Sequence, residues 1–303
     1  MYASALAYNR SYTFSVLIPK HDQLAYWEEI EEGVQTAVNA LRDFHIAAHI
    51  EYYKRFDEGS FEEVTDKCLQ KNPDGFVIVP TDIEVTRKFT DKLHEIGTPF
   101  VLLDSYMPDL RPLAFFGQNS FSSGYFAARM LMLIANQEKE IVLMKITKNG
   151  RMMSKQQDNR EVGFRHYMRD HYPSIEIITL EMPFEATRAE YDKVFENFFT
   201  QHPHVHQCIT LGSRAHIMGE FLLRTNRRDV QIMGYDMVSK NADCLRLGSV
   251  SFLIAQHAYQ QGYFCVDALF RAIVLKKKVE PVNYMPIELL TKENVDFYRR
   301  EQL

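Results

Sequence analysis

The chain has 303 residues, of which 46% are apolar and 25% are charged, and its formal net charge is −5 at pH 7. This length is large for one hydrophobic core and sufficient for two. The acidic balance argues against a nucleic-acid-binding surface over the whole chain, and no apolar run is long enough for a membrane helix. The first twelve residues lack the charged and apolar regions of a signal peptide, so we expect a cytoplasmic protein.

Strands and helices alternate along the first third of the chain, after a short helix expected over residues 3–10. Four apolar strands are expected at residues 12–19, 46–53, 75–80 and 99–104, and the helices between them at 25–44, 60–70 and 85–96. Ser60, with Glu63 three residues later, has the pattern of a capping box. Apolar strands that alternate with helices predict βαβ units and a parallel sheet, which is an α/β fold.

A second set of strands and helices follows a proline-rich segment, residues 107–116, that ends in a short edge strand. Its strands are expected at residues 140–146, 175–180, 208–211, 230–234 and 250–255, and its helices at 121–136, 159–170, 188–201, 214–224 and 260–275. Residues 147–158 are polar and are expected to form a flexible loop. Two short strands near residues 283 and 286–289 close the chain, so the sequence predicts two lobes.

Two polar residues stand just past the ends of two strands of the second set. Asp236 follows the strand at 230–234, and Gln256 follows the strand at 250–255. Ligands of open α/β sheets bind at the carboxyl ends of parallel strands. A carboxylate that accepts hydroxyl hydrogen bonds and an amide that donates and accepts them suit a polyol such as a sugar. In the alternative interpretation, Asp236 caps the next helix and Gln256 ends a surface strand.

Three more residues are candidates for ligand contact. Arg160 stands near the start of a helix, where its guanidinium could fork onto two hydroxyls or could pair with Glu161 on the surface. Tyr26 and Trp27 follow the first strand, where their rings could stack on a sugar or pack between the lobes. Because polar groups in an open cleft would be wet, we expect Arg160→Ala and Asp236→Ala to weaken ligand binding and leave folding nearly unaffected.

Signals of catalysis are missing from the sequence. There is no G-x-S-x-G elbow, no P-loop and no G-x-G-x-x-G, so we expect neither an enzyme nor a cofactor. His202, His204 and His206 have no carboxylate or cysteine at ligand spacing, so we expect a loop there and no metal site. The four cysteines lack C-x-x-C spacing and are expected to be reduced core residues.

Five segments, in order along the chain, resemble the LacI/GalR family of transcription regulators. They are ASALAYNRSYTFSVLIP, FGQNSFSSGYFAARML, NREVGF, IMGYD and FLIAQHAYQQGYFCVDALF. The resemblance runs from Ala3 to about Tyr298. It implies a two-lobed fold like that of type I periplasmic binding proteins, in which each lobe is a parallel sheet flanked by helices and the chain crosses three times, near Gly117, Gln256 and Val282.

The resemblance also implies how the chain is divided. Residues 1–11 would be the remnant of a hinge helix that links the lobes to DNA-binding heads. The N-terminal lobe would comprise residues 12–117 and 256–282, and the C-terminal lobe 118–255 and 283–303. The family's helix-turn-helix head has no counterpart here, and Leu6 matches the leucine that enters the DNA minor groove in the intact protein. Operator DNA is therefore expected to bind only when the head is present.

The function that the resemblance implies is sensing of an effector by a cytoplasmic homodimer. A sugar or sugar-derived ligand would bind in the interlobe cleft and control DNA binding allosterically. The alternative is a periplasmic sugar-binding protein of a transporter. The implied ligand-binding residues are Tyr26, Trp27, Asp104, Arg160, Ser213, Arg214, Asp236 and Gln256.

One departure from the family's pattern concerns the charge of the ligand. Ser213 and Arg214 stand where many members have Asn-Asp. Together with Lys145, Lys148 and Arg151, this arginine is expected to crowd one side of the cleft with positive charge. Since guanidinium donors match two oxygens at once, we expect a preference for an acidic or phosphorylated sugar.

Overall fold

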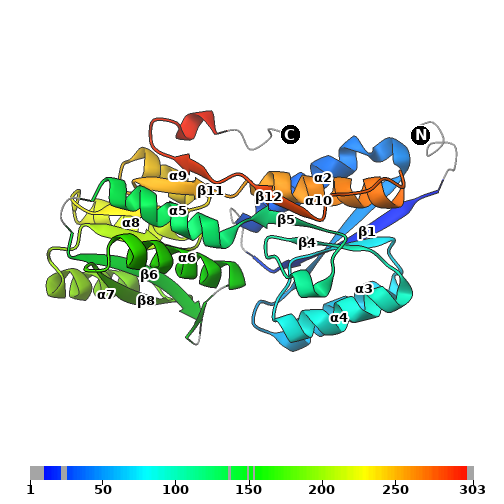
Figure 1. Cartoon of the computed structure of the whole chain (residues 1–303), viewed down its shortest axis with the longest axis horizontal. Helices are drawn as coiled ribbons and strands as arrows, with labels where there is room; N and C mark the ends of the chain where they lie inside the picture. The colour runs from blue at the N-terminus through cyan, green and yellow to red at the C-terminus, as the bar shows by residue number, and fades with distance from the viewer. Residues whose placement is uncertain (1–9, 22–25, 136–137, 149, 153, 299–303) are drawn as a thin grey trace. The chain divides into compact units, whose positions relative to one another are not determined.

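The computed structural model describes residues 10–21, 26–135, 138–148, 150–152 and 154–298; for residues 151 and 152 it describes the backbone alone. The chain forms two compact units. The first comprises the described residues up to Gln118 and His257–Met285, and the second comprises Asn119–Gln256 and the described residues from Pro286 onward (Figure 1). None of the described helices is long and apolar enough to span a membrane. Leu6 and most of the expected hinge helix lie outside the described residues.

These boundaries differ by a few residues from those expected from the sequence. Gln256, expected in the first lobe, belongs to the second unit, and residues 283–285, expected in the second lobe, belong to the first. The reason for the second difference is strand pairing. Strand β12 (Val282–Met285) pairs in parallel with β5 (Ala114–Gln118), so it is an integral part of the first sheet.

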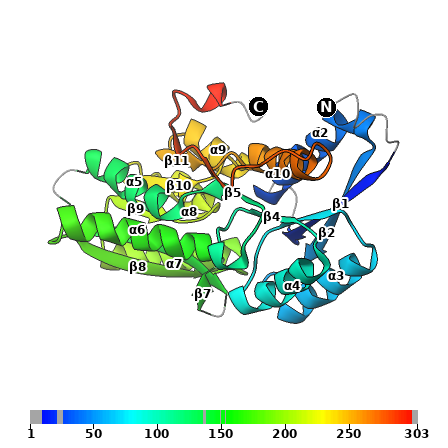
Figure 2. The same ribbon diagram turned by 45° about the vertical axis from the view of Figure 1, so that its right-hand side comes forward.

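The first unit contains a six-stranded sheet in the order β12-β5-β4-β3-β1-β2, and all the neighbouring strands are parallel. Its other strands are β1 (Tyr12–Pro19), β2 (Ile46–Tyr53), β3 (Gly75–Ile78) and β4 (Phe100–Leu103). Helices α3 (Glu58–Gln70) and α4 (Ile83–Ile96) cover one face, and α2 (Tyr26–Ala40) and α10 (Ala258–Ile273) cover the other (Figures 1 and 2). Both faces are buried, which explains the continuous apolar runs in these strands.

The second unit contains seven strands in the order β13-β11-β10-β9-β6-β7, and β8 also pairs with β6. The strands are β6 (Glu140–Lys148), β7 (Arg151–Met152), β8 (Glu176–Pro183), β9 (Gln207–Thr210), β10 (Gln231–Tyr235), β11 (Phe252–Ala255) and β13 (Glu288–Leu290). Only β7 and β13 pair in the antiparallel sense among the described strands. The two-lobed α/β fold expected from the sequence is therefore confirmed.

Helices cover both faces of the second sheet. One buried core lies under α5 (Ser120–Leu133) and α6 (Lys155–His171). The other core lies under α7 (Arg188–Gln201), α8 (Ala215–Arg224) and α9 (Ser239–Arg246). Alternate residues of each strand enter the two cores; Leu143 of β6 faces α5 and α6, whereas Val142 and Met144 face the other helices.

In the first unit, two glycines bring α2 and α10 into close contact. A Cβ atom on Gly33 would lie 1.9 Å from the carbonyl oxygen of Tyr259, and one on Gly262 would lie 2.2 Å from that of Ile30. Real Cβ atoms do not approach so closely, so these backbones touch only because both positions lack a side chain.

The second unit repeats the arrangement with α5 and α6. A Cβ atom on Gly124 would lie 1.9 Å from the carbonyl oxygen of Arg160, and one on Gly163 would lie 2.0 Å from that of Phe121. This crossing fixes the position of α6, and with it the position of Arg160, relative to the sheet.

Three local expectations were wrong. Helix α3 is capped by Asp57, whose side chain accepts from the Ser60 backbone N–H at 2.9 Å, so Ser60 lies inside the helix. Helix α6 begins at Lys155, with Ser154 as its cap, in a segment expected to be a loop. Strand β5 lies between β4 and β12 and is not an edge strand.

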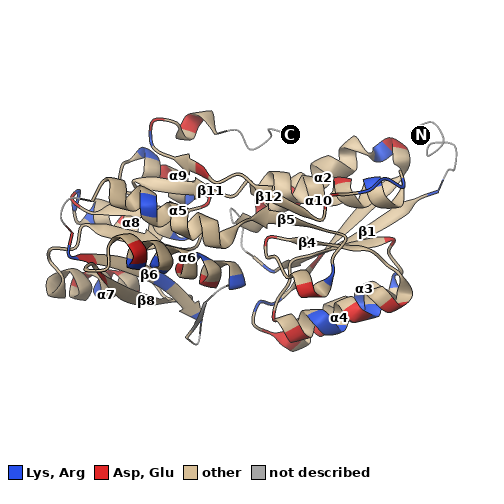
Figure 3. Ribbon diagram, in the orientation of Figure 1, with Lys and Arg blue, Asp and Glu red and all other residues tan. Residues whose placement is uncertain are grey.

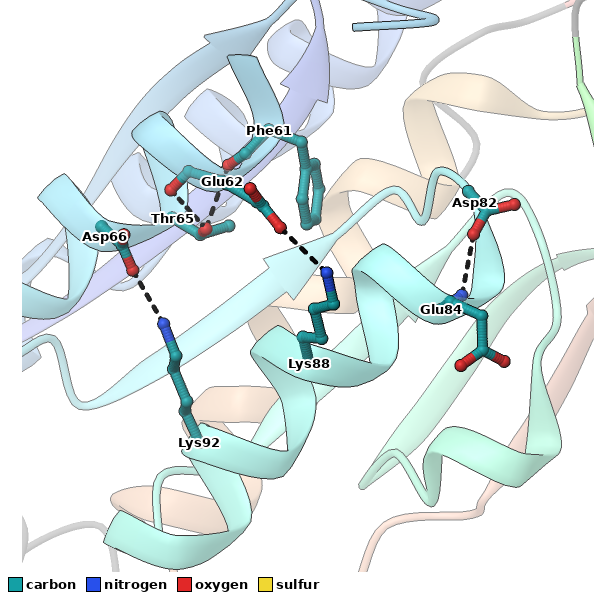
Figure 4. Close-up of polar contacts among 8 residues, drawn as sticks. All are labelled: Phe61, Glu62, Thr65, Asp66, Asp82, Glu84, Lys88 and Lys92. Atoms are coloured by element: carbon teal, nitrogen blue, oxygen red, sulfur yellow. Dashed lines mark hydrogen bonds and ion pairs between the residues drawn. The ribbon is translucent and has the colours of Figure 1, made fainter. Parts of the chain in front are cut away.

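Helices α3 and α4 carry both basic and acidic residues (Figure 3). Lys92 of α4 pairs with Asp66 of α3 at 2.9 Å, and Lys88 pairs with Glu62 at 3.4 Å (Figure 4). All four side chains are at least half exposed, so each pair contributes no more than about 1 kcal/mol. Both pairs are therefore solvated.

Candidate ligand-binding site

Each unit places an aspartate with the same unusual backbone just past the end of a strand. Asp104 follows β4 with φ 70°, and Asp236 follows β10 with φ 71°. The Asp104 N–H donates to Phe116 of β5 at 2.9 Å, and the Asp236 N–H donates to Ile254 of β11 at 3.0 Å. The left-handed conformation costs about 1–2 kcal/mol for a residue other than glycine. Its occurrence at both strand ends marks these positions as functional candidates.

In the first unit, Asp104 joins a hydrogen-bonded chain. The Tyr26 hydroxyl donates to Asp104 Oδ1 at 2.9 Å and accepts from Gln261 Nε2 at 3.0 Å. Ser105 Oγ donates to the other oxygen of Asp104 at 3.3 Å. Tyr26 is the first residue of α2 and Gln261 lies on α10, so the glycine-mediated contact between these helices brings the two side chains together.

Trp27 adjoins this cluster. Its ring meets the Tyr26 ring edge-on, with centroids 5.0 Å apart and an interplanar angle of 79°. The guanidinium of Arg55 lies 5.2 Å from the centroid of the Trp27 ring. The indole therefore makes an aromatic and a cation–π contact within its own unit.

In the second unit, Arg160, Gln256 and Asp236 form one network. Arg160 Nη1 donates to the Leu211 carbonyl at 2.7 Å, and Nη2 donates to Gln156 Oε1 at 2.8 Å. Nη2 also donates to Gln256 Oε1, and Gln256 Nε2 donates to Asp236 Oδ1 at 2.5 Å. The amide thus links a cation to a carboxylate, since its oxygen accepts from one and its nitrogen donates to the other.

The burial of this network contradicts the expectation of wet polar groups. Arg160 is only 1% exposed, Asp236 5% and Gln256 4%. The neighbouring carboxylate, Glu161, pairs with Lys145 and Arg165, and the Arg160 guanidinium lies 4.0 Å from the centroid of the Tyr235 ring. Because carbonyl and amide oxygens and an aromatic face support a buried cation here, Arg160 contributes to folding as well as to the site. Nor does it pair with Glu161, as the alternative interpretation proposed.

Tyr235 packs against the Arg160 guanidinium of this network. Its hydroxyl accepts from Ser123 Oγ at 3.2 Å. Burial raises the pKa of Tyr235, although the nearby Arg160 cation opposes the shift. The phenol therefore stays neutral and presents an electron-rich face to the guanidinium.

The remaining predicted residues are occupied within the second unit. Ser213 offers its backbone carbonyl to Asn241 Nδ2 at 3.0 Å. Arg214 donates to the Phe184 carbonyl at 2.8 Å, and its guanidinium lies 3.9 Å from the centroid of the Phe184 ring. These contacts hold the β9–α8 loop and the start of α8 in place.

The lysines expected to add positive charge are paired with carboxylates. Lys145 pairs with Glu161 at 2.7 Å, and Lys148 pairs with Glu185 at 2.7 Å. Burial acts to raise the pKa of Glu161, but hydrogen bonds from Lys145 and Arg165 outweigh it and lower that pKa. The side chain of Arg151 lies outside the description. Two of the four cations on which a preference for acidic sugars was based, Lys145 and Lys148, are thus paired with carboxylates.

The described residues contain no group of three or more His, Cys, Asp or Glu side chains that could hold a metal ion. His202 lies 3.3 Å from Glu140, and His206 lies 3.2 Å from Asp229, so each of these histidines faces a separate carboxylate.

Sequence reasoning missed three residues that complete the two clusters. Gln156 and Gln261 lie on helices, and so does Asn241, which contacts the backbone of Asp236. All three are buried polar side chains. The available signal was a polar residue at an apolar-face position of a helix, such as Gln261 one turn after the start of α10.

Comparisons with known proteins agree with this fold. Residues 14–278 match the family model described as a periplasmic binding protein domain. No curated protein matches the chain in sequence. The solved structure of a candidate LacI transcriptional regulator from Bacteroides fragilis is 42% identical, with a TM-score of 0.92; the match covers 96% of this chain and 100% of that one.

Two more distant solved structures share the fold. A solute-binding protein of an ABC transporter from Burkholderia graminis, in complex with D-arabinose, has a TM-score of 0.84 at 15% identity, over 95% of this chain and 98% of that chain. Another from Bacillus halodurans, with bound myo-inositol, has a TM-score of 0.81 at 18% identity, over 95% and 97%. The family model covers most of the chain and the relative from Bacteroides covers nearly all of it. The chain therefore belongs to the periplasmic binding protein domain family.

Proposed function

We propose that the protein is the effector-sensing and dimerising part of a LacI-type transcription regulator. The observation that carries the proposal is the 42% identity to a candidate LacI regulator over the full length of that chain. The ABC transporter solute-binding proteins named above are only 15% and 18% identical. In this proposal the protein acts in the cytoplasm as a homodimer, and effector binding changes its affinity for operator DNA allosterically.

The chemistry of the strand-end clusters supports a neutral sugar or polyol as the effector. Asp104 and Asp236 are carboxylates suited to accept hydroxyl hydrogen bonds, and Tyr26 and Gln256 add groups that both donate and accept. Lys145 and Lys148 already pair with carboxylates, so they offer little compensation to an anionic ligand. D-arabinose and myo-inositol, the ligands in the two transport-protein structures, are both neutral and rich in hydroxyl groups.

A thermal-shift screen tests the ligand class. A neutral ligand at 100 times its Kd adds about 2.7 kcal/mol to the free energy of unfolding. We expect a shift with at least one neutral sugar or polyol, starting with D-arabinose and myo-inositol, and a weaker shift with its acidic or phosphorylated derivative. A stronger shift with the charged derivative would contradict the proposed ligand class.

A sugar-binding protein of a transporter is the second candidate, favoured by the fold shared with the two solute-binding proteins. Deleting the gene separates the two candidates. If the protein is a regulator, the deletion should alter transcription of a small set of genes and abolish their response to the sugar. An Asp236→Ala allele should also abolish that response. If the protein belongs to a transporter, the deletion should slow uptake of the sugar and leave the transcription of these genes unchanged. That result would overturn the regulator proposal.

A further inference from the structure

Asn241 lies on α9, is fully buried and binds the backbone on both sides of the Asp236 Cα atom. Its Nδ2 atom donates to the carbonyl oxygens of Tyr235 at 2.9 Å and of Asp236 at 3.1 Å. The same nitrogen lies 3.0 Å from the Ser213 carbonyl oxygen. One amide therefore reaches the loops that follow both β9 and β10.

The other end of the amide binds the start of α8. Asn241 Oδ1 accepts from the His216 backbone N–H at 2.9 Å and from His216 Nδ1 at 2.9 Å. The residue at the cap of α8, Arg214, makes no side-chain capping hydrogen bond, so Asn241 supplies an acceptor to the first turn from another helix. A backbone N–H can only donate and carbonyls can only accept, so these partners fix the orientation of the amide.

These contacts bear directly on the strained residue of the site. The carbonyls of Tyr235 and Asp236 belong to the two peptide planes that flank the Asp236 Cα atom. Holding both planes restricts φ and ψ of Asp236, whose φ of 71° is disfavoured for a residue with a side chain. Without this support, relaxation toward a common conformation would turn the carboxylate away from Gln256.

We infer that Asn241 is a positioning residue for ligand recognition, which acts by holding Asp236 in its left-handed conformation. The inference rests on the proposed binding of a sugar or polyol by Asp236. Asn241 therefore affects the affinity for the ligand through Asp236, because its own amide is fully buried and is hydrogen-bonded to protein groups.

The test uses Asn241→Asp, which has nearly the same shape and keeps an acceptor for His216 but removes both N–H donors. The matched control is Asn294→Asp in the same unit. Asn294 Oδ1 accepts from the Thr291 N–H at 2.7 Å, and its Nδ2 donates to the Leu289 carbonyl at 3.2 Å. By isothermal titration calorimetry with D-arabinose and myo-inositol, we expect Asn241→Asp to lower affinity at least about tenfold, as one buried hydrogen bond to a polar group predicts. Asn294→Asp should change it less than about twofold.

A double-mutant cycle separates positioning from general loss of structure. In an Asp236→Ala background, Asn241→Asp should have almost no further effect on affinity, because the carboxylate that it positions is gone. Additive losses would overturn the inference. If Asp236→Ala alone leaves affinity unchanged, the proposed binding site is wrong; if it lowers affinity while Asn241→Asp does not, only the role of Asn241 fails.

A crystal structure of the variant without ligand provides a test that needs no known effector. In Asn241→Asp the backbone at Asp236 should leave the left-handed region, and an unchanged φ near 70° would overturn the inference. If Asn241→Asp does not fold at neutral pH, Asn241→Ser serves in both tests, since it leaves no buried carboxylate beside three carbonyl oxygens.

Discussion

The two units support their strand-end aspartates in different ways. Asp104 and Asp236 share a left-handed backbone and the same hydrogen bond to a neighbouring strand. The carboxylate of Asp104 accepts from a tyrosine and a serine hydroxyl, whereas that of Asp236 is linked through Gln256 to the buried cation of Arg160. The backbone geometry is therefore repeated in the two units, but the groups that support the carboxylate differ. Neutral hydroxyls support it in the first unit, and an amide bound to a buried cation supports it in the second.

Arg160→Ala should show the largest effect, because it deletes the largest of the described side chains that are fully buried and removes its hydrogen bonds to Leu211 and Gln156. We expect a loss of about 3–5 kcal/mol in the free energy of unfolding, measured with urea. Arg214→Ala is the control; Arg214 also contacts a carbonyl and a ring but is only half-buried, and its loss should be about 1 kcal/mol. Equal losses would show that burial does not distinguish Arg160.

The helix crossings should respond alike in the two units. Gly33→Ala and Gly124→Ala would each place a Cβ atom 1.9 Å from a backbone oxygen of the partner helix. Each should lower the free energy of unfolding by about 1–3 kcal/mol, whereas Gly59→Ala, at an exposed position of α3, should be neutral or stabilising by up to about 1 kcal/mol. A large loss for one crossing only would show that the units do not depend equally on these contacts.

Tyr26→Phe tests the Asp104 cluster of the first unit. The change removes the hydroxyl that donates to Asp104 and accepts from Gln261 but keeps the ring. We expect a loss of about 1–2 kcal/mol in stability, smaller than that for Arg160→Ala, together with weaker binding of the sugar identified by the thermal-shift screen. Tyr52→Phe, at an exposed position, is the control. A stability loss as large as that for Arg160→Ala would remove the contrast between the two clusters.

The smallest effect concerns pH. Burial lowers the pKa of His216, which forms a hydrogen bond with Asn241 in the second unit. Because the unfolded state then binds protons more readily, stability should fall as pH decreases through the ordinary histidine value of about 6.5 and toward the lower folded pKa. His216→Gln should flatten that part of the urea-unfolding profile between about pH 7 and 5, while Tyr26→Phe in the first unit should leave its slope unchanged. A profile that is identical with and without His216 would contradict this expectation.

The sequence was sufficient for the fold and for the strand-end residues, because both follow from local pattern. Apolar strands bounded by helices define the sheets, and Asp236 and Gln256 were found because they immediately follow strands. Gln261 and Asn241 were missed because their partners lie on other elements and depend on how helices pack. The full burial of Arg160 was also unexpected, since arginine is seldom buried and sequence spacing does not reveal the oxygens and ring that surround it.

Smaller errors arose where two local signals compete. Asp57 and Ser60 are both residue types that commonly cap helices, and they lie three residues apart. Asp57 is the N-cap of α3 because its backbone is extended and its side chain accepts from the Ser60 N–H. Similarly, the polar residues after β6 have the composition of a loop, yet the Ser154 cap allows α6 to begin among them.

The interruption of the first unit by the second constrains how the protein can be made. Strand β12 and helix α10, which complete the first sheet and cover one of its faces, are synthesised after nearly all of the second unit. A nascent chain that ends at Gln118 still exposes apolar residues of β3, β4 and β5 that α10 later buries. The ribosome must therefore release more than 280 residues before the first unit can complete its sheet, whereas all but the last segment of the second is already available. The N-terminal unit, although translated first, is expected to become protease-resistant last.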